Sequence, residues 1–266
     1  MITSTSSSQV KHIVNLQKKS KLRKEEKQFV VEGIKMVSEA PKDRLVKVYV
    51  SETFKADNDE FLKKMNYEAL GKDILEAVSD NVFIRMSDTQ TPQGIMAVVK
   101  MSEITIEDLF GRDMHINSNT IQPLLLILEN LQDPGNLGTI IRMAEGAGVT
   151  GVIMSCNTVD IYNPKTIRST MGSLYRVPVI YVDDICEAVE ECKQKGIRVY
   201  AAHLKGTDNY NLCLTASYVN IVHAIAAFSD STFPCIGILT SSSALSVSLS
   251  VSPFPSLPII NAVGCV

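Results

Sequence analysis

The residues best placed to do chemistry lie in one segment, Glu129–Arg142, with the sequence ENLQDPGNLGTIIR. This segment directly follows the apolar run Leu124–Leu128, which is typical of a buried parallel strand. Open α/β sheets bind ligands at the carboxyl ends of their strands. The loop after this strand is therefore expected to lie at such a site, and Asn136 and Arg142 bring the hydrogen-bond donors of an amide and a guanidinium near it.

The local pattern of this segment is a turn that leads into a helix. Asn136 is expected to cap a helix that begins at about Leu137. Arg142 lies six residues further on, and at about 100° per residue the two side chains fall on different helical stripes. They can meet only around a substrate at the amino end of the helix. Spacing alone favours a simpler alternative, a DPGN turn followed by a surface arginine.

A second segment, NPKTIRSTMGS from Asn163 to Ser173, offers an anion site. Asn then Pro is typical of a helix cap and first helical position. Lys165 and Arg168 would lie on the first turns, where cations and backbone N–H groups can bind an RNA phosphate. An ordinary capped helix with a basic face is the commoner outcome. Gly172 is expected inside the helix Pro164–Leu174 at a cost of about 1 kcal/mol against alanine, so close backbone packing would explain it.

The amino-terminal region is basic although the chain carries a net charge of −3. The first 30 residues hold seven basic and two acidic side chains, a local charge of +5. Clustered cations of this kind can release counterions from RNA phosphates, and the predicted contacts are Lys18, Lys19, Arg23 and Lys24. The alternative is a solvated helical face.

Two other chemistries are disfavoured. Gly146–Gly151 matches GxGxxG, but a dinucleotide fingerprint follows a strand and opens a helix, whereas here a helix precedes the glycines and a strand follows. The glycines fit a helix cap and tight loop, which argues against a Rossmann oxidoreductase. The six cysteines form no CxxC pair and have no histidine at ligand spacing, so neither a zinc site nor a disulfide framework is expected.

The elements that position these residues form two α/β regions. Residues 1–101 are expected to form a first domain and 102–122 a linker ending before Pro123. A repeating βα pattern over residues 123–210 predicts a second domain with a parallel sheet. The helices and strands expected in the first domain are 9–28, 28–33, 34–40, 45–50, 61–70 and 95–99, and those in the second are 124–128, 137–147, 151–154, 164–174, 179–181, 185–195 and 198–202.

Residues 211–266 differ in composition from the rest of the chain. They contain eleven serines and a single charged residue, Asp230. The alternation from Ser246 to Ser252 is compatible with a strand or with low-complexity sequence. The chain shows no apolar run of about 18 residues and its first residues lack the apolar core of a signal peptide, so a cytoplasmic protein without a membrane span is expected.

Residues 8–210 resemble the SpoU (TrmH-like) class of SPOUT RNA 2′-O-methyltransferases. ENLQDPGNLGTIIR looks like the first family motif, and Asn163-Pro164-Lys165 through Arg168 and Gly172, with Val177-Pro178-Val179, looks like the second. The basic opening with Phe29–Gly33 and Glu39-Ala40 looks like the family's L30e/L7Ae-like substrate-binding domain. The resemblance implies an L30e-like α/β domain followed by a SPOUT α/β domain, which carries a trefoil knot in the family.

The resemblance also implies an activity. S-adenosylmethionine would be the methyl donor and a ribose 2′-hydroxyl of RNA the acceptor, the group that distinguishes RNA from DNA. Asn136 and Arg142 would take the catalytic positions, Arg142 by orienting the substrate and stabilising negative charge, since a guanidinium keeps its proton. Ala202, His203 and Leu204, at the carboxyl end of the strand expected over residues 198–202, are candidates to bind the cofactor, although a loop hydrogen bond is the commoner role of such a histidine. The extra domain favours ribosomal over transfer RNA.

The resemblance weakens in the tail. The third family motif has a Gly-Asn-Glu-x-x-Gly-Leu loop without a counterpart here, and Leu245-Ser246-Val247-Ser248 echoes only its second half. We therefore hypothesise that residues 211–266 do not form the knot, which would weaken S-adenosylmethionine binding, and expect a homodimer only if the tail folds. A catalytically defective RNA-binding protein is the alternative function.

Overall fold

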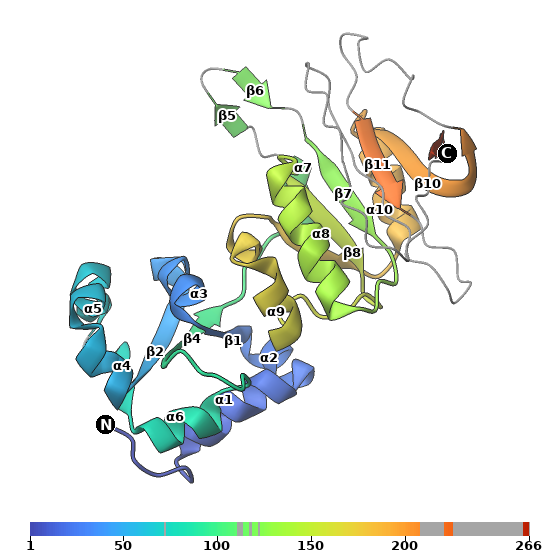
Figure 1. Cartoon of the computed structure of the whole chain (residues 1–266). Helices are drawn as coiled ribbons and strands as arrows, with labels where there is room; N and C mark the ends of the chain where they lie inside the picture. Colours follow the sequence, from blue (N-terminus) through green and yellow to red (C-terminus); the bar gives the residue numbers. More distant parts are fainter. Residues whose placement is uncertain are drawn as a thin grey trace. The chain divides into compact units, whose positions relative to one another are not determined.

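The computed structural model describes residues 1–71, 73–110, 114–116, 119–121, 123–207, 221–225 and 263–265 (Figure 1). They fall into two compact units. Unit 1 contains Met1–Glu103, Pro134–Thr139 and Asp160–Arg176. Unit 2 contains Ile104–Asp133, Ile140–Val159 and Val177–Val266. The region expected to form the second domain thus contributes two segments to unit 1.

Unit 1 is built on a four-stranded sheet in the order β1-β4-β2-β3. The central strand β4 pairs antiparallel with both β1 and β2, and β3 runs parallel to β2. The apolar runs that predicted three of these strands are confirmed, whereas β3 was not predicted because its four residues carry too short a pattern. The strands are β1 (Gln28–Glu32), β2 (Leu45–Ser51), β3 (Leu75–Val78) and β4 (Ile95–Lys100).

The helix expected over residues 9–28 is two helices, α1 (Ser8–Lys18) and α2 (Ser20–Glu26). Lys19 between them is extended, with φ −113° and ψ 104°. The last carbonyls of a helix have no partner within it, and here Arg23 Nη1 donates to the carbonyls of Leu16 and Gln17 at 2.7 and 2.9 Å. The break is therefore stabilised by a side chain from the following helix. The remaining helices near this sheet are α3 (Ile34–Ser38), η1 (Lys42–Arg44), α4 (Glu52–Asp57), α5 (Asp59–Met65), η2 (Tyr67–Leu70) and α6 (Asp80–Met86).

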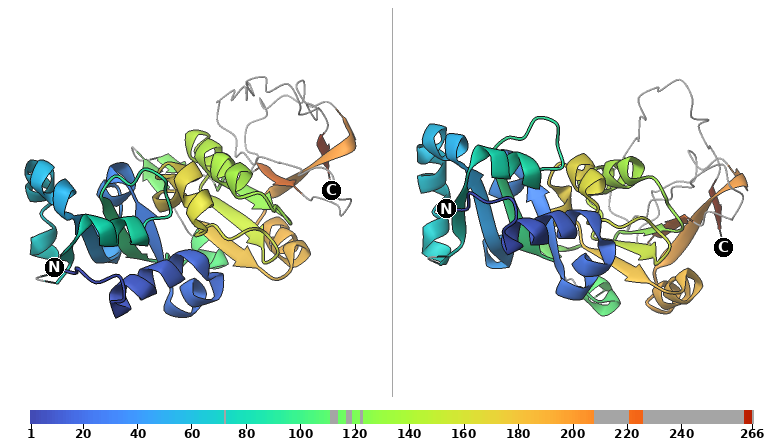
Figure 2. Two further views of the ribbon diagram at one scale, coloured as in Figure 1. Left: turned by 60° about the horizontal axis from the view of Figure 1, so that its bottom comes forward. Right: turned by 90° about the horizontal axis from the view of Figure 1, so that it is seen from below.

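The core of unit 1 lies under α1 and α6, which run side by side (Figure 2). Val10, Ile13 and Leu16 recur at helical spacing and are fully buried against Phe83 and Met86 of α6. This apolar stripe explains why the lysines of α1 are left on the opposite face, as an amphipathic helix requires.

Unit 2 is built on a six-stranded sheet in the order β12-β10-β11-β7-β8-β9. The pairs from β10 to β9 are parallel and only β12 pairs antiparallel, so the expected parallel α/β sheet is confirmed. β7 lies between two strands, which is why its sequence is a continuous apolar run. The strands are β7 (Leu125–Leu128), β8 (Gly151–Ser155), β9 (Val179–Val182), β10 (Arg198–Thr207), β11 (Ile221–Ile225) and β12 (Val263–Cys265).

The helix α10 (Ile185–Gln194) buries Ile185, Ala188 and Cys192 against the sheet. Burial raises the pKa of the Cys192 thiol to about 12, so this thiol stays protonated and apolar. The expected linker contains α7 (Ile106–Phe110) and a two-stranded sheet of β5 (Met114–Ile116) and β6 (Asn119–Ile121). No helix among the described residues is long and apolar enough to span a membrane.

Two strands come from the tail. β11 pairs in parallel with both β10 and β7, and β12 pairs with β10. The rest of residues 211–266, including the alternation from Ser246 to Ser252, lies outside the described residues. The hypothesis about the knot therefore stays a hypothesis.

Candidate functional site

The helix of the first motif, α8 (Pro134–Gly146), begins earlier than expected. Asn136 was expected to cap it, but Pro134 is its first residue and Asn136 its third, because proline fits a first helical position as well as a turn. Thr139 Oγ1 donates to the Gly135 carbonyl at 3.0 Å inside this first turn. Asn136 and Arg142 are both exposed on α8.

The loop between β7 and α8 is bonded to the loop that follows β8. Asn130 has the left-handed φ of 57°, and its N–H donates to Ser155 Oγ at 2.9 Å. Gln132 Nε2 donates to the Asn157 carbonyl at 2.7 Å, and Val159 N–H to the Leu131 carbonyl at 2.8 Å. Sequence reasoning missed Gln132 and Ser155 as supports of this edge. The sequence did contain a signal for these supports, because polar residues directly follow two neighbouring strands.

The second motif forms α9 (Pro164–Thr170), followed by η3 (Ser173–Tyr175). The Asn163 side chain accepts from Lys165 N–H at 2.9 Å, so the expected cap is confirmed. Gly172 was expected inside the helix but lies just after it, with φ 99°. A Cβ at Gly172 would lie 2.2 Å from Glu39 Oε2. The expected close backbone packing is therefore not found: the near atom belongs to the end of a side chain, and the left-handed turn is what favours glycine here.

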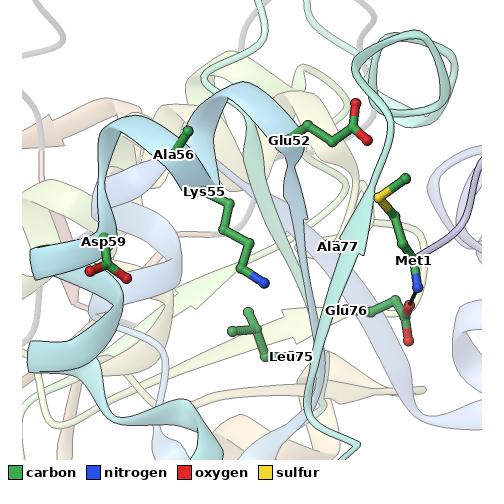
Figure 3. Close-up of a pocket in the computed structure, with 8 residues that line it drawn as sticks. All are labelled: Met1, Glu52, Lys55, Ala56, Asp59, Leu75, Glu76 and Ala77. Carbon is green, nitrogen blue, oxygen red and sulfur yellow. Dashed lines mark ion pairs between the residues drawn. The ribbon is translucent and has the colours of Figure 1, made fainter.

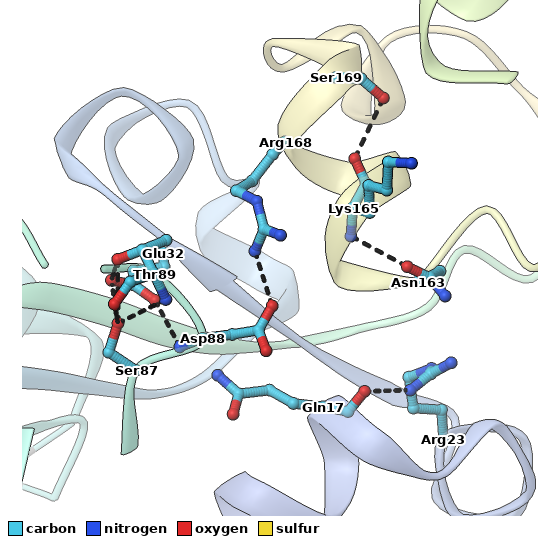
Figure 4. A network of polar contacts seen from close by, with 10 residues as sticks. All are labelled: Gln17, Arg23, Glu32, Ser87, Asp88, Thr89, Asn163, Lys165, Arg168 and Ser169. Atoms are coloured by element: carbon cyan, nitrogen blue, oxygen red, sulfur yellow. Dashed lines mark hydrogen bonds and ion pairs between the residues drawn. The ribbon is translucent and has the colours of Figure 1, made fainter. Parts of the chain in front are cut away.

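Arg168 of α9 is paired with a carboxylate of the loop after α6 (Figure 4). Its Nη1 donates to Asp88 Oδ2 at 2.9 Å, and both side chains are more than two-fifths exposed. Glu32 holds this loop, because Ser87 Oγ and Thr89 Oγ1 each donate to its Oε1 at 2.7 Å. Exposed ion pairs of this kind contribute about 0–1 kcal/mol. A competing anion can therefore replace Asp88 at little cost.

Arg23 differs from the lysines predicted beside it. It is only 3% exposed, and its Nε and Nη2 donate to Asp160 Oδ2 at 3.1 and 2.6 Å. Ser20 Oγ donates to the same oxygen at 2.8 Å. Arg23 was predicted to contact an RNA phosphate, but its hydrogen-bond donors are used inside unit 1, which contradicts that prediction. Asp160 lies far from Arg23 in the sequence, so no local sequence pattern predicts their ion pair.

Three more contacts fasten residues 160–176 within unit 1. Phe29 and Tyr162 stack with ring centroids 4.5 Å apart. Tyr175 Oη donates to the Met36 carbonyl at 2.9 Å, and burial raises the pKa of this phenol. Arg176 Nη1 donates to Glu39 Oε2 at 2.7 Å. Arg168 and the exposed Lys165 are therefore carried on a segment anchored at both ends.

The residues predicted to bind a cofactor lie inside a strand. The strand was expected to end at Ala202, but β10 continues to Thr207, so His203 and Leu204 lie within the strand and not after it. Their side chains lie outside the described part of the chain. Pairing of β10 with β12 is irregular between Ala202 and Thr207. The parallel strands β7, β10 and β11 end at one edge of the sheet, which is the topology that fits a cofactor crevice.

An open depression of about 770 Å³ lies elsewhere, in unit 1, and contains none of the predicted site residues (Figure 3). The Met1 ammonium contacts Glu76 Oε1 at 3.0 Å there and lowers the pKa of that carboxyl, mainly through this hydrogen bond. Among the residues with described side chains, no three histidine, cysteine or acidic groups gather as a metal site would require.

The comparisons with known proteins assign this arrangement to a class. Residues 7–97 match the MRM3-like substrate binding domain and residues 123–226 match the SpoU rRNA Methylase family. A crystal structure of an AdoMet-bound rRNA methyltransferase from Sinorhizobium meliloti superposes with a TM-score of 0.68 at 25% identity, over 88% of this chain and 82% of that one. The fold is the SPOUT α/β fold. Residues 123–226 thus form a domain of the SpoU rRNA Methylase family, preceded by an MRM3-like substrate binding domain.

Two curated relatives agree. The Bacillus subtilis 23S rRNA (guanosine(2553)-2′-O)-methyltransferase RlmP is 36% identical over 50% of this chain and 48% of its own length. The mitochondrial rRNA methyltransferase 3 of Xenopus laevis is 31% identical over 75% of this chain and 45% of its own length. The chain thus spans about half the length of these relatives. The family match reaches residue 226, beyond residue 210, where the sequence alone suggested that the resemblance ends.

Proposed function

We propose that this protein methylates a ribose 2′-hydroxyl of ribosomal RNA, with S-adenosylmethionine as methyl donor. The observation that carries the proposal is the position of the first motif, on the loop and helix that follow the central parallel strand β7. The relatives named as rRNA 2′-O-methyltransferases support the same activity and substrate class.

Asn136 and Arg142 are the proposed catalytic residues. In methyl transfer the ribose hydroxyl would give its proton to water, and its oxygen would carry negative charge until the new bond to the methyl carbon forms, with S-adenosylhomocysteine as the leaving group. The exposed guanidinium of Arg142 can donate to that oxygen or to a neighbouring phosphate, and it stabilises the charge without accepting the proton. The Asn136 amide, on the first turn of α8, is proposed to orient the ribose.

The cofactor is proposed to bind at the carboxyl edge of β7, β10 and β11, with Ala202, His203 and Leu204 among its contacts. When bound, S-adenosylmethionine supplies an electrophilic methyl group. The bonded loops after β7 and β8 give this edge a fixed wall, through Asn130, Gln132 and Ser155.

A direct test is to incubate the purified chain with radiolabelled S-adenosylmethionine and ribosomal RNA lacking the modification. We expect label in RNA, at a nucleotide that resists alkaline cleavage because its 2′-oxygen is methylated. The same RNA with a deoxyribose at that nucleotide should take no label. RNA retention without any transfer would instead support the defective RNA-binding protein.

RNA capture is proposed to use the exposed lysines Lys18, Lys19 and Lys24, together with Lys165 and Arg168 of α9. Asp88 forms an exposed ion pair with Arg168, and an RNA phosphate can take the place of the Asp88 carboxylate. The sequence argument for a homodimer and for a cytoplasmic location stays a proposal. Light scattering of the purified chain tests the dimer, and fractionation of cells tests the location.

Replacing Lys18, Lys19 and Lys24 together with alanine should weaken RNA binding and its salt dependence. Each phosphate contact contributes about 0.7–0.9 to the slope of log affinity against log salt. If all three lysines contact phosphates, the slope should fall by about 2. Filter binding at several salt concentrations measures it. The matched control is Lys55, Lys63 and Lys64 to alanine, three exposed lysines of α4 and α5; an equal fall there would contradict a specific basic face.

A further inference from the structure

The first turns of α8 touch α9 more closely than side chains normally allow. A Cβ built on Gly138 would lie 1.9 Å from Ser169 Oγ and 2.9 Å from the Ser169 carbonyl carbon. Real Cβ atoms essentially never come within 3.0 Å of another heavy atom. The two helices therefore meet through a glycine on one side and a serine on the other, both in unit 1.

The hydroxyl of Ser169 also reaches the start of α8. Its Oγ lies 3.3 Å from the carbonyl of Pro134, the first residue of α8. In its own helix it lies 2.9 Å from the Thr166 carbonyl and 3.1 Å from the Lys165 carbonyl. Figure 4 shows the contact with Lys165. Serine hydroxyls often bond back within a helix in this way. The contacts with Pro134 and Gly138, more than thirty residues away, go beyond that common role.

Asn136 lies on the turn between these two contacts. At Pro134 the carbonyl of this turn shares the Ser169 hydroxyl with two carbonyls of α9, and at Gly138 the turn packs against Ser169. Catalytic side chains must be held within about 0.5 Å of their working geometry by the residues around them. We propose that Ser169 is a positioning residue, which fixes the turn that carries Asn136 through its hydroxyl and its small size. This proposal rests on the proposed function of Asn136.

The first test is Ser169→Ala in the full chain. Loss of the hydroxyl should lower kcat for methyl transfer about tenfold, the size expected when one hydrogen bond worth about 1.4 kcal/mol is lost only in the reacting geometry. KM for RNA and for S-adenosylmethionine should stay within twofold. The matched control is Ser38→Ala, because Ser38 Oγ bonds back to the Lys35 carbonyl at 2.9 Å in α3 without such a contact to α8. An unchanged kcat, or a change in KM alone, overturns the proposal.

The second test couples the two sides of the contact. Gly138→Ala should also lower kcat, because the new methyl group must push Ser169 away. Adding Ser169→Gly removes the Oγ and Cβ that obstruct this methyl group, so the double variant should recover part of the loss. Strictly additive losses would contradict a direct contact between the two positions.

A third readout does not depend on activity. The side-chain amide resonances of Asn136, assigned by their disappearance in Asn136→Asp, should shift or broaden in Ser169→Ala and not in Ser38→Ala. If the wild-type chain transfers no methyl group, the proposed function fails, while this spectrum still decides whether Ser169 positions Asn136. Unchanged Asn136 resonances overturn the positioning role in either case.

Discussion

Replacing Arg142 with alanine is expected to lower kcat for methyl transfer by about 10²–10³-fold, the loss seen when one preorganised donor to a developing oxyanion is removed. The physical reason is that Arg142 is the proposed donor to the ribose oxygen as its negative charge grows. KM for S-adenosylmethionine should change little. Single-turnover assays with saturating RNA measure the chemical step directly.

Two variants sharpen this prediction. Arg142→Lys keeps the charge but loses the planar fork of donors, so its rate should lie between wild type and alanine. Arg85→Ala removes an exposed arginine of α6 and should leave kcat unchanged. Because Arg142 is exposed on its helix, the thermal midpoint of Arg142→Ala should stay close to wild type. A rate within twofold of wild type would exclude Arg142 from the chemistry.

The candidate site could be found in sequence because its signals are local. The apolar run of β7 predicts a buried parallel strand, and the motif that follows is then placed at a ligand-binding edge by topology alone. The cap by Asn163 followed from an Asn-Pro pair in the same way. Each of these inferences needs only neighbouring residues, which is why they agree with the structure.

The errors have physical causes of two kinds. Some patterns are ambiguous within a few residues: Asp133–Asn136 fits a turn, yet Pro134 also fits a first helical position, and in the structure the helix begins at Pro134. Other features depend on partners far along the chain. The burial of Arg23 and the close contact at Gly172 come from the side chains of Asp160 and Glu39, which no local pattern encodes.

The pair of Arg23 and Asp160 gives the largest expected effect on stability. Asp160→Ala should lower the free energy of unfolding by about 3–5 kcal/mol, because it leaves a buried guanidinium without its counter-charge. Arg23 is 3% exposed and Asp160 15%, so water can compensate little of this loss. Urea denaturation followed by circular dichroism measures the difference.

A matched control for this prediction is Asp88→Ala. Asp88→Ala breaks the ion pair with Arg168. Like the pair of Arg23 and Asp160, this pair joins a residue of the first 103 to one of residues 160–176, but both of its side chains are exposed. An exposed pair contributes about 0–1 kcal/mol, so Asp88→Ala should destabilise the chain far less than Asp160→Ala. Equal effects would mean that burial does not set the strength of this contact.

The double variant Arg23→Met with Asp160→Ala separates the charge from the packing. It removes the uncompensated guanidinium, so it should be more stable than Asp160→Ala alone. It should still be less stable than wild type, since Arg23 also donates to the carbonyls of Leu16 and Gln17 at the end of α1. Those carbonyls would lose the side-chain donor from α2 that joins the two helices across the break at Lys19, next to the proposed RNA-binding lysines.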